Sequence, residues 1–128
     1  MDKIRYAYLA NQIFIACLEI HKQLGPGLLE SVYEFALVKE LQLRHIFVQY
    51  QVKVLLMYKG HETGKDFYID VLVENEIVRE AKAVDLLHPV HQAQLLSYLK
   101  LFDKRLGFLV NFNVVLLKDG FKRMVNNY

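Results

Sequence analysis

Apolar residues recur at steps of three and four along the first third of the chain, which is the period of an amphipathic helix. The pattern predicts one helix over residues 3–23 and a second over about residues 28–44. Gly25-Pro26-Gly27 separates them, because two glycines around a proline cannot continue a helix. One stripe of the first helix, which is mostly apolar, is marked by Ile4, Ala7, Tyr8, Asn11, Phe14, Ile15, Leu18 and Lys22. Along the second helix, steps of three and four residues connect Leu29, Val32, Tyr33, Ala36, Leu37, Glu40 and Leu41.

The period changes to two from Phe47 onward, which is typical of strands. Apolar runs with short connections predict three strands, over about residues 47–58, 64–73 and 77–84, in an antiparallel meander. A third helix is predicted over about residues 90–102. Its core candidates are Val90, Ala93, Leu96, Leu99 and Leu101.

A continuous apolar run over residues 106–112 follows this helix and predicts a buried strand, parallel to the strand before the helix. Residues 114–118 and 121–125 predict a short terminal hairpin. The element order is therefore ααβββαββ. It indicates one α/β domain over residues 1–128, with a central mixed β-sheet flanked by helices.

Composition narrows the class of protein. Hydrophobic residues make up 54% of the chain and charged residues 23%, which is typical of a globular domain. The net charge of +2 does not by itself indicate a nucleic-acid partner. No apolar run approaches the roughly 18 residues of a membrane span, and the N-terminus lacks the features of a signal peptide. We therefore expect a cytoplasmic protein without a membrane partner, in which the single Cys17 is a buried thiol.

The stretch from Phe67 to Val84 carries the most informative charges. If Glu74-Asn75-Glu76 is the loop of a hairpin, positions whose numbers sum to 150 face each other, and Asp70 lies opposite Glu80. Alternation then places one set of side chains on the same face: Tyr68, Asp70, Leu72, Val78, Glu80 and Lys82. The other face is expected to carry Ile69, Val71, Val73, Ile77, Arg79 and Ala81.

Opposed carboxylates on an apolar element repel each other unless a cation compensates their charge. The oxygen ligands of Asp70 and Glu80 suit Mg²⁺ or Mn²⁺, and the backbone carbonyl of Ala81 is a further candidate ligand. Lys82 is placed to orient or deprotonate a water, or to neutralise charge on a phosphate. The alternative for these residues is an exposed hairpin face with a cross-strand ion pair.

Other candidate sites have weaker support. His88 and His91 lack a third ligand at a zinc spacing, and Cys17 and His21 lie four apart on one predicted helix. Glu30 lies in the first turn of the second helix, where the helix dipole favours a carboxylate. Glu30 either has this local role or points toward a site.

Further motifs extend this picture to most of the chain. Gly27, Glu30 and Tyr33 form G-x-x-E-x-x-Y, and Gln94 and Tyr98 form Q-x-x-x-Y. Together with Asp70 and Glu80-Ala81-Lys82, these motifs closely resemble the GxxExxY protein family of the PD-(D/E)XK nuclease-like superfamily. The sequence departs from that pattern at Ile69, where a basic or small residue is frequent, and at Ala81, where a larger apolar residue is usual.

The resemblance implies a restriction-endonuclease-like core in which Asp70 and Glu80 bind the metal and Lys82 is the catalytic lysine. It also implies that Glu30 completes the acidic cluster as an additional catalytic residue and metal ligand. Gln94, Tyr98 and Tyr33 would contact substrate or order the site.

Two functions are therefore weighed. The first is an Mg²⁺-dependent nuclease (Mn²⁺ is the other candidate metal) that hydrolyses phosphodiesters in DNA rather than RNA. The second is a catalytically weak or inactive nuclease-fold module that binds nucleic acid or a protein partner. Six basic residues of the last third are either phosphate contacts or a solvated surface: Lys100, Lys104, Arg105, Lys118, Lys122 and Arg123. The tyrosine-rich strands are compatible with a homodimer.

Overall fold

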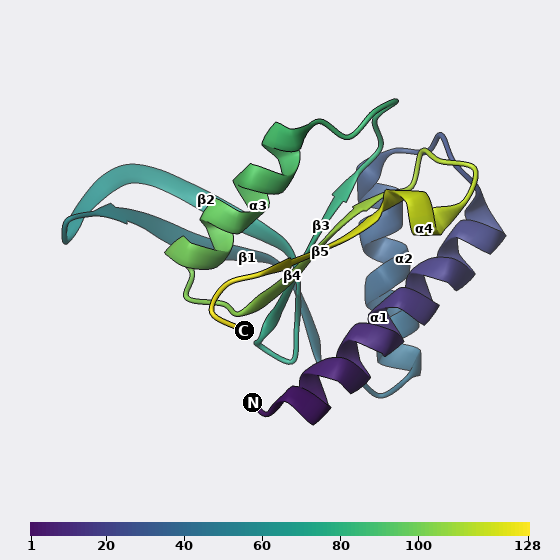
Figure 1. Ribbon diagram of the computed structural model, residues 1–128, viewed down its shortest axis with the longest axis horizontal. Helices are drawn as coiled ribbons and strands as arrows, with labels where there is room; N and C mark the ends of the chain where they lie inside the picture. The colour runs from purple at the N-terminus through teal and green to yellow at the C-terminus, as the bar shows by residue number, and fades with distance from the viewer.

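The computed structural model describes all 128 residues as one mixed sheet with helices on both faces (Figure 1). The strands are β1 (Val48–Tyr58), β2 (His61–Val73), β3 (Ile77–Lys82), β4 (Leu106–Asn111) and β5 (Phe121–Val125). The helices are α1 (Lys3–Leu24), α2 (Glu30–Leu43), α3 (Pro89–Leu101) and α4 (Leu117–Gly120). The strand order is β1-β2-β3-β4-β5, in which β3 and β4 are parallel and the other neighbours antiparallel. The predicted mixed sheet and its parallel crossover are confirmed.

Helices cover the two faces of the sheet unequally. In Figure 1, α1 and α2 lie on one side and α3 on the other, and the β1–β2 hairpin extends beyond the helices. The larger core joins α1 and α2 to the sheet through residues such as Leu9, Leu37 and Val71. The smaller core joins α3 to the opposite face through Leu95 and Leu99.

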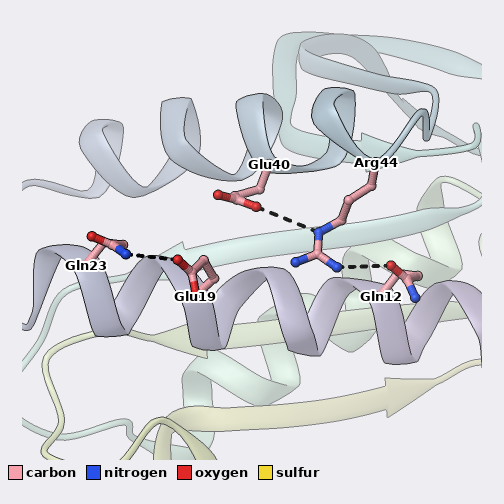
Figure 2. Close-up of polar contacts among 5 residues, drawn as sticks. All are labelled: Gln12, Glu19, Gln23, Glu40 and Arg44. Carbon is pink, nitrogen blue, oxygen red and sulfur yellow. Dashed lines mark hydrogen bonds and ion pairs between the residues drawn. The ribbon is translucent and has the colours of Figure 1, made fainter.

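Polar contacts tie α1 to α2 (Figure 2). Arg44, at the end of α2, donates from Nη1 to Oε1 of Gln12 at 3.2 Å, and its Nε lies 3.7 Å from Oε2 of Glu40. One turn apart on α1, Gln23 donates to Glu19 at 2.9 Å. Arg44 therefore links the two helices through a partly buried network.

The apolar stripe that the sequence marks on α1 is not the face that packs in the core. Ile4 is 84% exposed and Tyr8 is 47% exposed. The buried residues are Tyr6, Leu9, Ile13, Ala16, Cys17 and Ile20. Apolar residues surround most of α1, so the helical period defines two stripes and does not say which one meets the sheet.

Similar corrections apply to the other two long helices. In α2, Leu29 precedes the helix and is exposed, whereas Val38 is buried. In α3, only Leu95 and Leu99 are buried, and the predicted core residues Val90 and Leu101 are more than half exposed.

The predicted strand over residues 114–118 is also wrong, because the short helix α4 occupies residues 117–120. Leu117 is buried in the larger core. Gly120 approaches the carbonyl of Asn111 so closely that a Cβ atom would clash with it. This close approach returns the chain to the sheet, where β5 pairs antiparallel with β4.

An irregularity in the β1–β2 ladder changes which side chains face which helix layer. Gln51 has a φ of 49°, and Gln51 and Asp70 are missing from the ladder between the pairs Tyr50–Val71 and Val52–Ile69. Val71 packs in the core under α1 and α2, whereas Val52 and Ile69 pack in the core under α3. The prediction that Ile69 shares a face with Val71 is therefore wrong, because strict alternation breaks at this point.

Candidate functional site

The β2–β3 hairpin has the predicted register. Its ladder pairs are Val71–Arg79, Leu72–Val78 and Val73–Ile77, and each pair sums to 150. Two loop residues, Glu74 and Asn75, have φ values of 52° and 58°, and this left-handed backbone reverses the chain within three residues.

Beyond the pair Val71–Arg79 the two strands separate, and Asp70 lies at the fork between them. Asp70 belongs to neither the β1–β2 nor the β2–β3 ladder. Its Oδ2 accepts a hydrogen bond from the backbone amide of Ala81 at 3.3 Å. The Asp70 carboxylate thus replaces a backbone carbonyl as the acceptor for an amide of β3, and this contact brings the Asp70 carboxyl beside Glu80.

Glu80 is the more unusual member of the pair, because its side chain is only 8% exposed. Oε1 of Glu80 is buried and has no hydrogen-bond partner. Burial raises the pKa of Glu80 to about 8, and repulsion by Asp70 and a hydrogen bond shared with Asp70 add to this effect. The positive charges of Arg79 and Lys82 lower the pKa of Glu80 and so partly offset these effects.

Lys82 and Tyr98 border the carboxyl pair. Lys82 lies two residues after Glu80 in β3 and therefore on the same face of the sheet. Tyr98 projects from α3, and its ring centroid lies 3.9 Å from that of Phe67. The pKa of Tyr98 is raised by burial and then by the charges of Glu80 and Asp70. The structure therefore brings Asp70, Glu80, Lys82 and Tyr98 together.

Gln94 lies one turn before Tyr98 on α3, where it is exposed and its side chain makes no hydrogen bond within the chain. The predicted role of Gln94 in binding substrate or ordering the site stays a prediction.

Glu30 reaches the end of β3 from the other helix layer. It is the first residue of α2, and its Oε1 accepts a hydrogen bond from the amide of Ala83 at 3.3 Å. Ala83 directly follows Lys82, so Glu30 lies beside the strand end that carries the lysine. No three acidic, histidine or cysteine side chains gather as a metal-binding group. The role of Glu30 as a third ligand stays a prediction.

Tyr33 fixes the corner that precedes Glu30. Its fully buried hydroxyl donates to the carbonyl of Gly25 at 2.7 Å and accepts from the amide of Leu28 at 3.1 Å. The ring stacks on Phe112 with centroids 4.2 Å apart. Tyr33 therefore holds the corner before α2, and its side chain has no exposed surface. Its role in binding substrate or ordering the site stays a prediction.

Two buried polar residues that support the site were not assigned a role from the sequence. Asn111, in β4, binds both the amide and the carbonyl of Val84, at 3.2 and 2.9 Å. It pairs with Lys82 across the parallel ladder and so holds the segment that leaves β3. In the sequence, the signal for this role was a single asparagine at the end of an otherwise apolar strand. Arg79 is fully buried and donates from Nη2 to the carbonyl of Tyr33 at 3.4 Å, which links β3 to α2.

The weaker candidates have local roles. The backbone amide of His88 donates to Nδ1 of His91 at 3.1 Å, within a reciprocal cap at the start of α3. Cys17 is fully buried as predicted, and burial raises its pKa to about 12. Nε2 of His21 lies 2.9 Å from the carbonyl of Val114.

The Asp70–Glu80 pair fits a divalent cation. Both residues supply hard oxygen ligands, and the Oε1 atom of Glu80 is buried without a donor. Magnesium commonly binds one or two protein carboxylates and retains water ligands, so a third carboxylate is not required. The backbone carbonyl of Ala81 stays a predicted ligand.

Comparison with known proteins identifies the family. A model of the PD-(D/E)XK nuclease superfamily matches residues 7–124. No curated protein and no solved structure gives a significant match. None of the helices is both long enough and apolar enough to cross a membrane. The mixed five-stranded sheet with flanking helices agrees with the restriction-endonuclease-like fold of that superfamily, as predicted. The chain therefore belongs to the PD-(D/E)XK nuclease superfamily.

Proposed function

We propose that this protein is a metal-dependent nuclease of the GxxExxY group within the superfamily. Asp70, Glu80 and the carbonyl of Ala81 would hold Mg²⁺ or Mn²⁺, and Glu30 is a further candidate ligand. The observation that carries the proposal is the Asp70–Glu80 carboxyl pair, in which Oε1 of the buried Glu80 lacks a donor and Lys82 lies on the same face.

A divalent cation at this position would neutralise charge on a phosphodiester and activate a water. The residues of the chain have distinct tasks around it. Glu80 must release its proton to become a full ligand, since burial raises its pKa to about 8. The ammonium of Lys82 neutralises charge that develops on a phosphate oxygen or orients the attacking water. The hydroxyl of Tyr98 is a hydrogen-bond donor to a phosphate at the same face.

The basic residues of the last third support binding of a phosphate backbone only in part. Nζ of Lys104 donates to the carbonyl of Asn75, and Nη1 of Arg105 donates to the carbonyl of Asn127. Arg123 stacks over the ring of Tyr128. Three residues have no such partner and are the better candidates for contacts with DNA: Lys100, Lys118 and Lys122.

The raised pKa of Glu80 favours a second candidate function. A carboxyl that keeps its proton near neutral pH binds a cation weakly. Such a chain would be a catalytically weak or inactive nuclease-fold module that binds nucleic acid or a protein partner.

The deciding experiment incubates the protein with linear, circular and single-stranded DNA, and with RNA, in Mg²⁺, Mn²⁺ or EDTA. We expect metal-dependent cleavage of DNA that is lost in Asp70→Asn, Glu80→Gln and Lys82→Met. Lys59→Met, in the β1–β2 turn, and Glu62→Gln, at the exposed start of β2, are matched controls that should retain activity. Cleavage that survives in Asp70→Asn or Lys82→Met would contradict the proposal.

Binding to labelled DNA in EDTA separates the two candidates. An inactive wild-type protein that still binds DNA by fluorescence anisotropy would support the binding module. An inactive protein that does not bind DNA would indicate a module that binds a protein partner.

A further inference from the structure

The half of β3 that carries the candidate catalytic residues has a neighbouring strand on one side only. The ladder with β2 ends at Arg79. Glu80 and Lys82 follow it and pair only with β4. The last pair of this parallel ladder joins Lys82 to Asn111, and both strands end there. The position of Lys82 therefore depends on what holds the chain directly after these strand ends.

The side chain of Asn111 continues the ladder beyond the strand ends. Its Oδ1 accepts from the amide of Val84 at 3.2 Å, and its Nδ2 donates to the carbonyl of Val84 at 2.9 Å. A side-chain amide has the same donor and acceptor as a peptide group, so Asn111 binds Val84 as a neighbouring strand would. The same Oδ1 also accepts from the amide of Asn113 at 3.2 Å. These three bonds satisfy a side chain that is only 2% exposed.

Two further contacts hold the same segment by one bond each. The amide of Phe112 donates to the carbonyl of Lys82 at 3.1 Å. Oε1 of Glu30, at the start of α2, accepts from the amide of Ala83 at 3.3 Å. Asn111 differs from both contacts because it engages the two backbone groups of one residue.

We propose that Asn111 is a positioning residue of the candidate nuclease site, which holds Lys82 in place relative to the carboxyl pair by fixing the backbone that follows it. This role rests on the proposed nuclease function, in which Lys82 neutralises charge on a phosphate oxygen or orients the attacking water.

The backbone matters here because the lysine side chain is a flexible four-carbon stem. The place of its Nζ atom depends on where the Lys82 backbone lies. Without Asn111, Val84 loses both of these bonds and the segment can shift. A displacement of about 1 Å in an active site can cost on the order of 100-fold in rate. Since Asn111 is buried and does not contact substrate, its loss should lower kcat and leave KM and DNA binding unchanged.

Asn111→Leu tests the proposal, because leucine is close in volume and makes none of the three bonds. The matched control is Asn126→Leu, at the opposite end of β4, where the Asn126 side chain donates to the carbonyls of Leu99 and Lys104 at 3.4 and 3.1 Å. Urea denaturation gives the folded fraction of each variant, and kcat for DNA cleavage with Mn²⁺ is expressed per folded chain. We expect kcat to fall roughly 100-fold in Asn111→Leu at an unchanged KM. Asn126→Leu should keep the wild-type kcat.

Amide hydrogen exchange is a readout that needs no cleavage. The amides of Phe112 and Ala83 both hold the segment around the lysine, and neither donates to Asn111. In Asn111→Leu both amides should exchange roughly tenfold faster than in the wild type, because the segment opens more easily. In Asn126→Leu they should keep the wild-type rate.

A second variant keeps the test independent of one substitution. Asn111→Asp retains Oδ1 but, when ionised, cannot donate to the carbonyl of Val84. It should change kcat and exchange in the same direction by a smaller factor, and it replaces Asn111→Leu if that variant does not fold. Unchanged exchange in the folded variant would overturn the proposal, as would an equal loss of kcat in Asn126→Leu. A wild type that cleaves nothing would refute the nuclease function alone, because exchange still shows whether Asn111 holds the backbone at Lys82.

Discussion

The buried carboxyl of Glu80 should make the metal-free protein less stable as the pH rises. The folded pKa of about 8 lies above the ordinary value of 4.5 because of burial and the nearby Asp70. Between these two pH values the native state holds about one proton more than the unfolded chain. The free energy of unfolding therefore falls with rising pH, which is the opposite of the usual behaviour of an ion-paired carboxylate.

The size of the effect follows from the pKa difference, which is about 8 minus 4.5, or about 3.5 units. One unit corresponds to about 1.4 kcal/mol, so the full loss would be about 5 kcal/mol if nothing rearranged. Movement of Lys82 toward the ionised carboxylate and entry of water reduce this penalty. We therefore expect a loss of about 2–3 kcal/mol between about pH 5 and pH 8.

Urea denaturation in EDTA measures the free energy of unfolding at each pH. Far-ultraviolet circular dichroism is the readout, because the chain has no tryptophan for fluorescence. Glu80→Gln keeps the shape of the side chain but cannot ionise, so its stability should change much less over the same pH range. The exposed Glu62→Gln is the control for loss of one charge and should follow the wild type. Parallel profiles for wild type and Glu80→Gln would refute the assignment of Glu80 as a carboxyl that stays protonated near neutral pH.

Three further substitutions test contacts that hold the site, each measured by urea denaturation. Tyr33→Phe keeps the stack on Phe112 but loses two buried hydrogen bonds, so it should cost about 1–3 kcal/mol; no cost would mean that the corner is held by packing alone. Arg79→Met removes a buried guanidinium whose Nε and Nη1 have no partner, and should be neutral or stabilising by about 1–4 kcal/mol; a large loss would contradict the absence of a compensating partner. Gly120→Ala should cost about 1–3 kcal/mol, because the new Cβ would clash with the carbonyl of Asn111; an unchanged stability would show that α4 shifts freely.

The sequence predicted the parts of the fold that depend on local chemistry. A three-residue loop fixes the register of a hairpin, so the pairing around Val71 and Arg79 followed from Glu74-Asn75-Glu76. The parallel strand β4 followed from its continuous apolar run after a helix. The predictions failed where tertiary contacts choose among equivalent local patterns, as in α1, where two apolar stripes were available and Leu9 rather than Ile4 is buried.

The site was predicted unevenly for the same reason. Asp70, Glu80 and Lys82 lie on two neighbouring strands of one hairpin, so its register predicted that they would be close, although the ladder itself ends at Val71 before it reaches Asp70. Tyr98 comes from a distant helix and was assigned through resemblance alone. The buried state of Glu80 was not predicted, because the pattern does not reveal that α3 covers this face with Leu95 and Leu99.

The fork at Asp70 connects the irregular part of the sheet to the candidate chemistry. If β2 had continued its regular pairing with β3, the amide of Ala81 would donate to the β2 backbone and not to the side chain of Asp70. Instead the ladder stops at Val71, the faces of β1 and β2 change at Gln51 and Asp70, and the Asp70 side chain takes the free amide. The same irregularity that spoils strict alternation thus fixes one carboxyl against its neighbour. A break in local regularity at this position is expected where a strand must present a functional group rather than only extend the sheet.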